Sequence, residues 1–324
     1  MLPEIDSPTV SIILPVYNKE AWIELTLRTI VNQSFKNWEC VIVDDGSTDD
    51  SREIIKNFIE WEPGNWKFIS QENAGQSAAR NKAISQSQGD YICFLDADDI
   101  WARNKIECQL EVFAKFPDTA LVLCPFISFK RRSSRFSLNF FRHYDSQKLL
   151  RGWLNMRGYG GGTESVGMVS RRALEATGGF DRSASTSSGL LLTLQLSKIG
   201  PIRFANKTLM GYRQYDGQWH QDQIELNRNM RRITDIYCAD KINEHERNSM
   251  SQDAYFFLTS RGKITDVFDY KGVGAKIDGF RLVALMALAL ISRRILSTFR
   301  GMLFKNYRIL SKNDFEDFLR QIRS

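Results

Sequence analysis

Short apolar runs alternate with amphipathic segments through the first third of the chain. Continuous apolar residues predict buried strands over 10–16, 40–43, 66–69 and 91–95. Apolar side chains at helical spacing predict helices over 19–32, through Ile54, Ile55 and Phe58, and over 74–87 and 103–116. Because strand–helix repetition of this kind builds a parallel sheet with helices on both faces, we expect an α/β fold.

The pattern changes after residue 118. A strand is predicted over 121–129, and a strand-to-helix unit follows a glycine-rich stretch and ends at Gly178-Gly179-Phe180-Asp181. Residues 190–196 are apolar enough for either a helix or a strand, and another strand ends at Tyr212-Arg213. We therefore expect one α/β domain in two parts, 1–118 and 119–220, and a helical C-terminal extension over 221–324.

Polar residues follow three of the predicted strands at the point where each strand ends. These clusters are residues 15–18, 44–47 and 96–99. In open parallel sheets the carboxyl ends of the strands share one edge, and ligands bind there. The three clusters therefore predict one polar site.

Two aspartates one residue apart, Asp96 and Asp98, are the centre of this site. Their carboxylates repel each other unless positive charge lies between them, and a hard divalent cation that also binds substrate phosphates is the natural partner. The alternative is a solvated turn in which Asp99 caps the next helix. At 44–47, we expect Asp44 or Asp45 to bind a nucleobase or a ribose, while Thr48 or Asp49 caps the following helix.

Four segments in the same order and spacing resemble the nucleotide-binding half of family 2 glycosyltransferases, which have the GT-A fold. They are VSIILPVYNKEAWI, QSFKNWECVIVDDGSTDDS, ENAGQSAARNKAI and GDYICFLDADDIW. The resemblance runs from residue 10 to 101 and continues more weakly to about residue 217. It implies a Rossmann-like, mostly parallel sheet, with 1–118 as the nucleotide-sugar-binding half and 119–220 as the acceptor-binding half.

The resemblance also implies roles for single residues. Asp45 falls at the position that contacts the base, Arg80 at an arginine near the base and phosphates, and Asp98 at the ligand of Mn²⁺ or Mg²⁺. Asp96 falls at the position that touches the ribose or the metal. The remaining donor-binding positions are Pro15, Val16, Tyr17, Glu20 and Ala97. The alternative for Arg80 is a salt bridge on the helix surface.

The chain departs from this family where a general base is expected. Family members carry a Glu-Asp pair shortly after the GGFD segment, and that pair falls here at Ser188-Gly189. No carboxylate lies between Asp181 and Asp216. A base from elsewhere, Glu164 or Asp181, is one explanation. The others are a catalytically degenerate protein and a shifted alignment in which Ser187 or Ser188 only positions the acceptor. The alternative for Glu164 is an exposed loop side chain, and the alternative for Asp181 is an aspartate that organises its own loop.

A second departure concerns the metal. Related enzymes add a histidine ligand in a Tyr-Arg-x-His pattern, whereas this chain has Tyr215 at that place. His220 is a candidate replacement, and the alternative for it is an exposed loop side chain.

The net charge of +6 hides a strong asymmetry. Residues 1–129 hold 11 Lys and Arg against 20 Asp and Glu, and residues 130–324 hold 33 against 18. A uniformly basic nucleic-acid coat is therefore excluded, and we expect no nucleic-acid partner. Within 279–304 an apolar face is flanked by Arg281, Arg293 and Arg294, which is typical of a helix on an anionic membrane surface. The alternative is a buried helix that packs on the core or on a partner subunit.

The cysteines and the N-terminus favour a cytoplasmic protein, peripheral on the inner membrane face at most. No two of the five cysteines form a C-x-x-C pair, which indicates buried, reduced thiols. The first residues lack a signal-peptide pattern, and the longest apolar stretch is too short to span a bilayer.

The resemblance to family 2 glycosyltransferases implies a metal-assisted, inverting transfer of a hexosyl group from a nucleoside-diphosphate sugar, with UDP as the first choice. The expected acceptor is a saccharide or lipid-linked saccharide in surface polysaccharide assembly. The rival is a degenerate sugar-nucleotide-binding or scaffold protein. A nucleotidyltransferase is disfavoured, because PVYNKEAWI lacks a glycine-rich loop for a triphosphate.

Overall fold

The structure is a computed structural model, and it describes residues 9–130, 136–139, 164–183, 188–215 and 307–309. The chain divides into two compact units, one of residues 1–147, 160–218 and 308–324, and one of residues 148–159 and 219–307. All described residues except Tyr307 belong to the first unit, so the architecture below is that of this unit alone.

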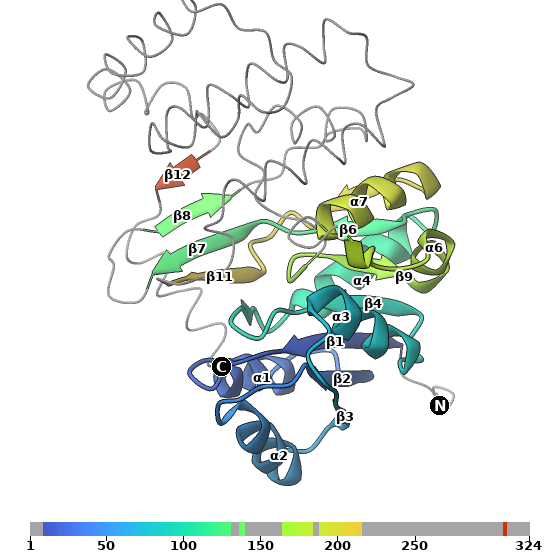
Figure 1. Cartoon of the computed structure of the whole chain (residues 1–324). Helices are drawn as coiled ribbons and strands as arrows, with labels where there is room; N and C mark the ends of the chain where they lie inside the picture. Colours follow the sequence, from blue (N-terminus) through green and yellow to red (C-terminus); the bar gives the residue numbers. More distant parts are fainter. Residues whose placement is uncertain (1–8, 131–135, 140–163, 184–187, 216–306, 310–324) are drawn as a thin grey trace, which may run out of the picture. The chain divides into compact units, whose positions relative to one another are not determined.

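A seven-stranded sheet forms the core of the unit (Figure 1). Its strand order is β10-β6-β9-β4-β1-β2-β3. The first four strands along the chain are all parallel to one another. They are β1 (Val10–Val16), β2 (Trp38–Asp44), β3 (Asn65–Ser70) and β4 (Tyr91–Phe94). Every residue of β1 and β2 is buried, and apolar residues make up most of both strands, as burial on both faces of a parallel sheet requires.

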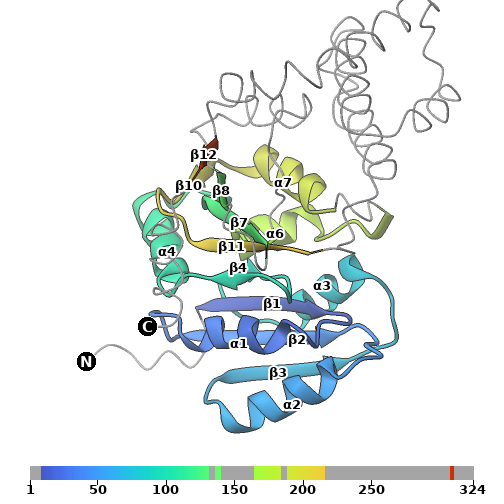
Figure 2. The same ribbon diagram turned by 90° about the vertical axis from the view of Figure 1, so that its left-hand side faces the viewer.

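Four helices connect and cover these strands: α1 (Ile23–Val31), α2 (Ser51–Trp61), α3 (Gln76–Ser85) and α4 (Lys105–Lys115). Helices α1 and α2 lie side by side on one face of β1–β3 (Figure 2), and α3 packs on β1 and β2. The fully buried apolar side chains of α1 are Ile23, Leu27 and Ile30, spaced by four and three residues as one helical face requires.

The chain reverses its direction of travel across the sheet at β1. It runs outward from β1 to β2 and β3, and then returns to pair β4 with the other side of β1. Neighbouring connections therefore diverge at the carboxyl ends of β1 and β4, and a crevice at such a switch point is where open α/β sheets bind ligands. The predicted α/β fold and the shared edge of the three polar clusters are confirmed.

The unit also contains a five-stranded second sheet, and one prediction fails where the chain passes from the first sheet to the second. The strand predicted over 121–129 is two strands, β6 (Leu121–Leu123) in the first sheet and β7 (Phe126–Lys130) in the second. Pro125 lies at the break, since proline has no N–H to donate to a sheet ladder.

The second sheet has the order β12-β8-β7-β11-β5. Its other strands are β5 (Ile100–Trp101), β8 (Phe136–Asn139), β11 (Met210–Gln214) and β12 (Tyr307–Ile309). The pairing of β11 with β5 brings the segment after β11 back to the acidic turn that precedes β5. Strand β12 is the described part of 221–324, and the helical extension predicted there otherwise lies outside the described residues and stays a prediction.

The later part of the unit completes the first sheet. It consists of β9 (Met168–Ser170), α6 (Arg171–Thr177), α7 (Ser188–Ile199) and β10 (Ile202–Phe204). The ambiguous segment 190–196 is helical and belongs to α7, which packs against α6. Strand β9 is antiparallel to both β4 and β6, so the sheet is mostly rather than wholly parallel.

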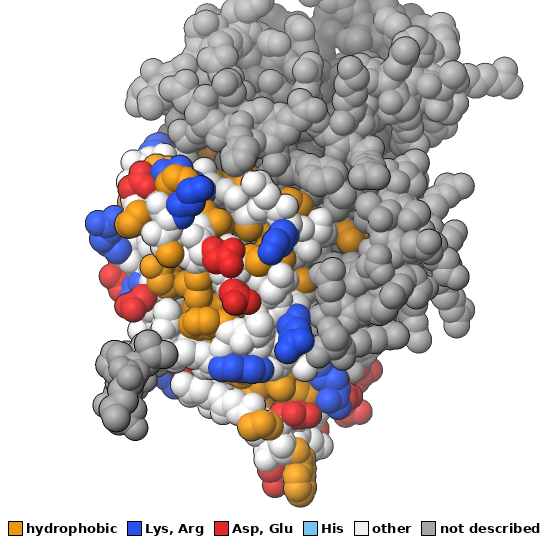
Figure 3. All heavy atoms as spheres, turned by 180° about the vertical axis from the view of Figure 1, so that it is seen from behind, with side chains coloured by type: hydrophobic (Ala, Val, Ile, Leu, Met, Phe, Trp, Pro, Cys, Tyr) orange, Lys and Arg blue, Asp and Glu red, His pale blue; other side chains and the backbone are white. Residues whose placement is uncertain are grey.

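The cysteines within the described residues, Cys40, Cys93, Cys108 and Cys124, are all buried and free, as expected. Burial raises the pKa of Cys93 to about 11 and that of Cys124 to about 12. Within the part of the chain that the structure describes, no helix has the length and apolar character needed to cross a bilayer. On the face shown in Figure 3, acidic and basic side chains of the described residues are interspersed with apolar ones.

Candidate active site

The first two strand-end loops are joined by reciprocal hydrogen bonds. The backbone N–H of Asn18 donates to Ser47 Oγ at 3.0 Å, and the N–H of Thr48 donates to Asn18 Oδ1 at 2.8 Å. Glu20 Oε2 accepts the N–H of Asp50 at 3.0 Å. These bonds fix the loop after β1 against the loop after β2, so that both form one wall at the carboxyl edge of the sheet.

The start of α2 differs slightly from the capping prediction. Asp50 is the N-cap residue and makes no capping bond with its side chain. Asp49, one residue earlier, accepts the N–H of Ser51 at 3.0 Å and so takes the capping role that the sequence predicted. Hydrogen bonds from Ser51 and Glu20 outweigh burial and lower the pKa of Asp49.

The residues expected around the nucleoside lie along this wall. Pro15 and Val16 are buried at the end of β1, and Tyr17, the next residue, has 46% of its surface exposed. The Asp45 carboxylate accepts three N–H bonds of 2.7–2.9 Å, from Gln71, Ala74 and Gly75. Asp45 therefore anchors the loop that leads into α3. A carboxylate accepts about four hydrogen bonds, so capacity for a ligand remains.

Gly46 is required by the close packing of these loops. Its φ is +77°, in the left-handed region, and a Cβ there would lie 2.8 Å from the backbone nitrogen of Asn73. The absence of a side chain at Gly46 therefore permits a tight backbone approach to the loop that contains Asn73.

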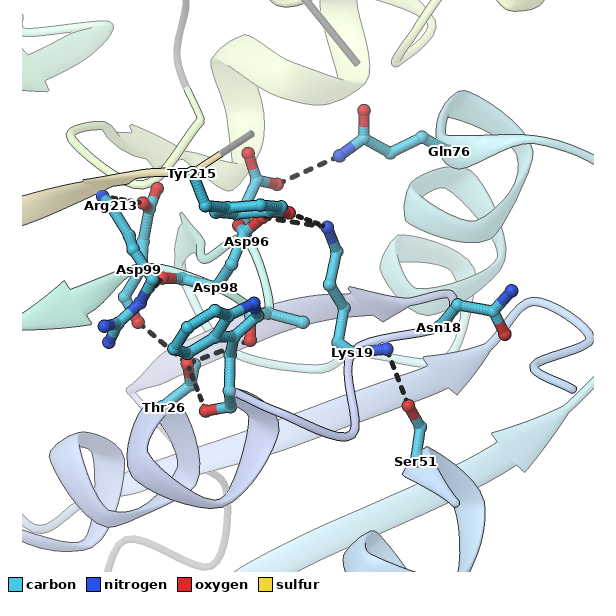
Figure 4. Close-up of polar contacts among 12 residues, drawn as sticks. Asn18, Lys19, Thr26, Ser51, Gln76, Asp96, Asp98, Asp99, Arg213 and Tyr215 are labelled. Carbon is cyan, nitrogen blue, oxygen red and sulfur yellow. Dashed lines mark hydrogen bonds and ion pairs between the residues drawn. The ribbon is translucent and has the colours of Figure 1, made fainter. Parts of the chain in front are cut away.

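Arg80 of α3 holds the first carboxylate of the acidic turn. Its Nη2 donates to Asp96 Oδ1 at 2.7 Å, and its Nη1 lies 3.4 Å from Glu164 Oε1. Gln76 Nε2, one turn earlier on α3, donates to Asp96 at 3.1 Å (Figure 4). The Arg80 side chain is 1% exposed and stacks on Phe180. A surface salt bridge is therefore excluded for Arg80.

The second carboxylate, Asp98, has a different cationic partner. Lys19 extends from the loop after β1 toward Asp98 and Tyr215 (Figure 4). Its Nζ donates to Asp98 Oδ2 at 2.8 Å, and the Tyr215 hydroxyl donates to the same oxygen at 2.7 Å. Burial alone would lower the pKa of Lys19, but Asp98 and Tyr215 outweigh it and raise that pKa. Burial and the Asp98 charge raise the pKa of Tyr215 to about 12.

The acidic turn is fixed from two sides. Thr26 of α1 donates its hydroxyl to the carbonyl oxygens of Ala97 and Asp99, at 3.0 and 2.8 Å. Arg213 of β11 donates Nε to the Asp98 carbonyl at 2.9 Å. Burial, with Asp98 and Asp96 nearby, raises the pKa of Asp99 well above its usual range. Asp99 does not cap a helix, because α4 begins only at Lys105, so this part of the alternative is wrong.

The donor set at Asp98 fits a hard divalent cation. Mg²⁺ and Mn²⁺ sites of this type use one or two protein carboxylates and complete the shell with phosphate oxygens and waters. In this structure the Lys19 ammonium group supplies the positive charge beside Asp98 that a metal ion would otherwise supply. Among the described residues no cluster of three or more His, Cys, Asp or Glu side chains could hold a metal by itself. His220 lies outside the described residues, so its role as a ligand stays a prediction.

The two candidate bases lie in different surroundings. The Glu164 side chain, 24% exposed, contacts Arg80 and the start of α7. Asp181 is exposed and accepts the N–H and the hydroxyl of Ser183, both at 2.7 Å, so it shapes its own loop. Of the two candidate bases, Glu164 is the one that contacts Arg80, which in turn binds Asp96.

Sequence reasoning missed three residues of this site. Lys19, Gln76 and Ser165 were not candidates, although Ser165 Oγ accepts the N–H of Asp96 at 3.0 Å. Tyr215 carried a signal, since it stands where a histidine ligand was expected. Lys19 and Ser165 carried none, because a lysine or serine in a loop is commonplace and only the fold shows what each contacts.

The comparisons with known proteins agree with this architecture. The family model described as Glycosyl transferase family 2 matches residues 11–176. The putative teichuronic acid biosynthesis glycosyltransferase TuaG of Bacillus subtilis is 43% identical over 104 residues, 32% of this chain and 41% of TuaG. The UDP-Glc:alpha-D-GlcNAc-diphosphoundecaprenol beta-1,3-glucosyltransferase WfgD of Escherichia coli is 38% identical over 111 residues, 34% of this chain and 43% of WfgD. The matched segments thus span about two fifths of these relatives.

Solved structures show the same fold at low sequence identity. TarS 1-349 of S. aureus, in complex with UDP-GlcNAc, superposes with a TM-score of 0.60 at 18% identity, over 87% of this chain and 79% of that one. The mannosyltransferase PcManGT of Pyrobaculum calidifontis, in complex with GDP-Man and Mn²⁺, gives a TM-score of 0.57 at 18% identity, over 91% and 88% of the two chains. With a GT-A-like fold and a family model matched over half of its length, the chain belongs to glycosyl transferase family 2.

Proposed function

We propose that this glycosyltransferase moves a hexosyl group from a UDP-sugar to a saccharide on a lipid diphosphate carrier. The observation that carries the proposal is the acidic turn at the switch point of the sheet. Its carboxylates, Asp96 and Asp98, are held apart by Arg80 and Lys19. Each carboxylate of this turn has a cationic side chain beside it. A carboxylate can accept the hydroxyls of a ribose, and positive charge at the same place can offset the charge of a diphosphate, so the turn suits a sugar nucleotide.

The strand-end wall supplies the rest of the donor site. Tyr17 offers an exposed ring on which a base can stack, and Asp45 retains acceptor capacity for the imide N–H of uracil. Asp96 accepts a ribose hydroxyl in this proposal, and its hydrogen bonds from Arg80 and Gln76 support that role by fixing the carboxylate. Glu20 acts indirectly, since its carboxylate holds the loop after β2.

Asp98 is the residue that would hold Mn²⁺ or Mg²⁺. When bound, the ion supplies positive charge to the departing nucleoside diphosphate. Lys19 and Tyr215 both hydrogen-bond to Asp98 Oδ2 and keep this oxygen oriented before the donor binds. The support for a metal is the donor chemistry at Asp98, together with the Mn²⁺ that PcManGT, a protein of similar fold, binds alongside GDP-Man.

The acceptor class is inferred from the relatives and from charge. WfgD is named for a diphosphoundecaprenol-linked acceptor, and TuaG for teichuronic acid synthesis. The basic second half of the chain, including Arg281, Arg293 and Arg294, suits an anionic lipid carrier at the cytoplasmic membrane face. We therefore place the reaction in surface polysaccharide assembly, with inversion at the anomeric carbon.

The test is transfer of sugar from UDP-sugars to lipid diphosphate saccharides with Mn²⁺, for the natural chain, Asp98→Asn and Asp118→Asn. Asp98→Asn removes the charge that holds the cation, so we expect transfer to fall about 10²-fold or more. Asp118, 63% exposed and paired with Arg203 at the surface, is the matched control and should leave transfer unchanged. UDP binding without transfer to any of these acceptors would instead favour a degenerate binding protein.

A further inference from the structure

The start of α7 has no acidic residue of its own, but the carboxyl group of Glu164 lies beside it. Helix α7 begins at Ser188-Gly189, and the sequence carries no acid from 182 to 215. A Cβ on Gly189 would overlap Oε1, Cδ and Oε2 of Glu164. The Glu164 carboxyl group therefore fills the volume in which a side chain at position 189 would begin.

The contacts of Glu164 tie it to this position. The Glu164 carboxyl group lies against the backbone of Gly189, closely enough that a Cβ there would overlap it. On the other side, Arg80 lies 3.4 Å from Glu164 and 2.7 Å from Asp96, so one guanidinium links Glu164 to the donor site. Glycine at 189 is thus part of the arrangement, because any larger residue there would displace the carboxyl group.

We infer that Glu164 is the general base of the transfer, supplied from the segment before β9 in place of an acid at the start of α7. The inference rests on the proposed function. Its main support is the geometry of Glu164, Gly189 and Arg80, which puts a carboxylate beside the donor-binding acid. With 24% of its side chain exposed, Glu164 is open enough to meet an acceptor hydroxyl.

The electrostatic surroundings suit a base. Burial is the largest influence and raises the pKa of Glu164, Arg80 opposes it, and Asp96 adds to the rise. A carboxylate with a raised pKa takes up a proton more readily than an exposed glutamate does, and general bases work best when their pKa approaches the working pH.

The step balances as a single displacement. The acceptor hydroxyl gives its proton to Glu164 as its oxygen forms a bond to the anomeric carbon of the donor sugar. The bond between that carbon and the β-phosphate oxygen breaks, and its electron pair leaves with the nucleoside diphosphate. Glu164 then releases the proton to solvent.

The competing explanation is that Glu164 only caps α7 and fixes Arg80. Glu164→Gln separates the two roles, because glutamine keeps the size and one hydrogen-bonding oxygen but is not a base. Glu175→Gln, at a side chain on α6 that is 65% exposed, is the matched control. Thermal unfolding and the Kd for UDP establish that each variant is folded and binds the nucleotide.

We expect Glu164→Gln to lower kcat for transfer by about 10²- to 10⁴-fold with the Kd for UDP unchanged. The acidic limb of the pH–rate profile should disappear in this variant and persist in Glu175→Gln. Gly189→Ala should also lower kcat without weakening UDP binding, since it moves the carboxyl group and keeps its charge.

Transfer by Glu164→Gln within about threefold of the natural chain, with the acidic limb retained, would overturn the inference and leave the proposed function standing. A loss of transfer explained wholly by weaker UDP binding would also overturn it, in favour of the structural role. If the natural chain itself binds UDP and transfers no sugar, the proposed function fails, and the inference with it.

Discussion

At the scale of single residues, the site is organised by two cations that divide two carboxylates between them. Arg80 binds Asp96, and Lys19 binds Asp98. The two differ in surroundings, since Arg80 is 1% exposed and Lys19 is 26% exposed. Arg80 is therefore a fixed part of the core, whereas the more exposed Lys19 can move away when a stronger cation arrives.

Lys19→Met tests this competition at Asp98. Removing the ammonium group takes a rival charge from the carboxylate, and a partly exposed ion pair contributes up to about 1 kcal/mol. We expect Mn²⁺ alone, titrated without nucleotide and followed by the EPR signal of the free ion, to bind about fivefold more tightly. Lys56→Met, at an exposed pair with Glu53, is the control. Unchanged or weaker Mn²⁺ binding in Lys19→Met would show that Lys19 does not compete with a metal.

At the scale of elements, the connections between strands and helices carry the specific geometry. Gly46 and Gly178 both have φ of +77°. Gly46 lies in the loop between β2 and α2, where a Cβ would meet the Asn73 backbone at 2.8 Å, whereas nothing lies within 4 Å of a Cβ at Gly178, the C-cap of α6. An alanine at Gly178 would therefore meet backbone strain alone, whereas an alanine at Gly46 would meet the same strain and a steric clash as well.

Gly178→Ala and Gly46→Ala form a matched pair for stability. The left-handed conformation alone costs an alanine about 1 kcal/mol, so Gly178→Ala should lose about that much free energy of unfolding in urea. Gly46→Ala should lose at least about 1 kcal/mol more, because the loop of Asn73 has to shift. Equal losses in the two variants would mean that the loops around Asp45 yield freely.

At the scale of the whole molecule, the charge asymmetry is the main feature. The acidic residues 1–129 contain the donor-site carboxylates, and the basic residues 130–324 carry the excess positive charge. On the face drawn in Figure 3, acidic and basic side chains of the described residues are interspersed, and no single negative patch covers that face. The basic residues Arg281, Arg293 and Arg294 lie outside the described residues, and the prediction about them rests on the sequence.

The full chain should therefore bind vesicles that contain anionic lipid, and bind neutral vesicles less. Each basic residue near an anionic surface contributes about 1 kcal/mol, so Arg293→Ala with Arg294→Ala should weaken binding about tenfold or more in a flotation assay. Screening at about 1 M salt should release the chain. Equal binding to neutral and anionic vesicles would contradict an electrostatic membrane contact.

The sequence alone determined the order of β1 to β4 along the chain, the helices α1 to α4 and the three polar strand ends. These depend on local periodicity, which a buried parallel strand or an amphipathic helix imposes on its own residues. Pro125 shows where this local rule fails, because a single apolar run there serves two sheets. The apolar segment 190–196 shows another limit, since its composition suited both a helix and a strand until packing against α6 made it α7.

Only the tertiary structure decided which side chains meet. Lys19 and Tyr215 reach Asp98 from 79 and 117 residues away, and Arg80 reaches Glu164 across 84. Such contacts depend on the order of strands in the sheet and on the pairing of β11 with β5, and neither leaves a local pattern. The same is true of Gly189. In the sequence it stands where an acidic residue was expected, and in the fold its missing side chain leaves room for the Glu164 carboxyl group.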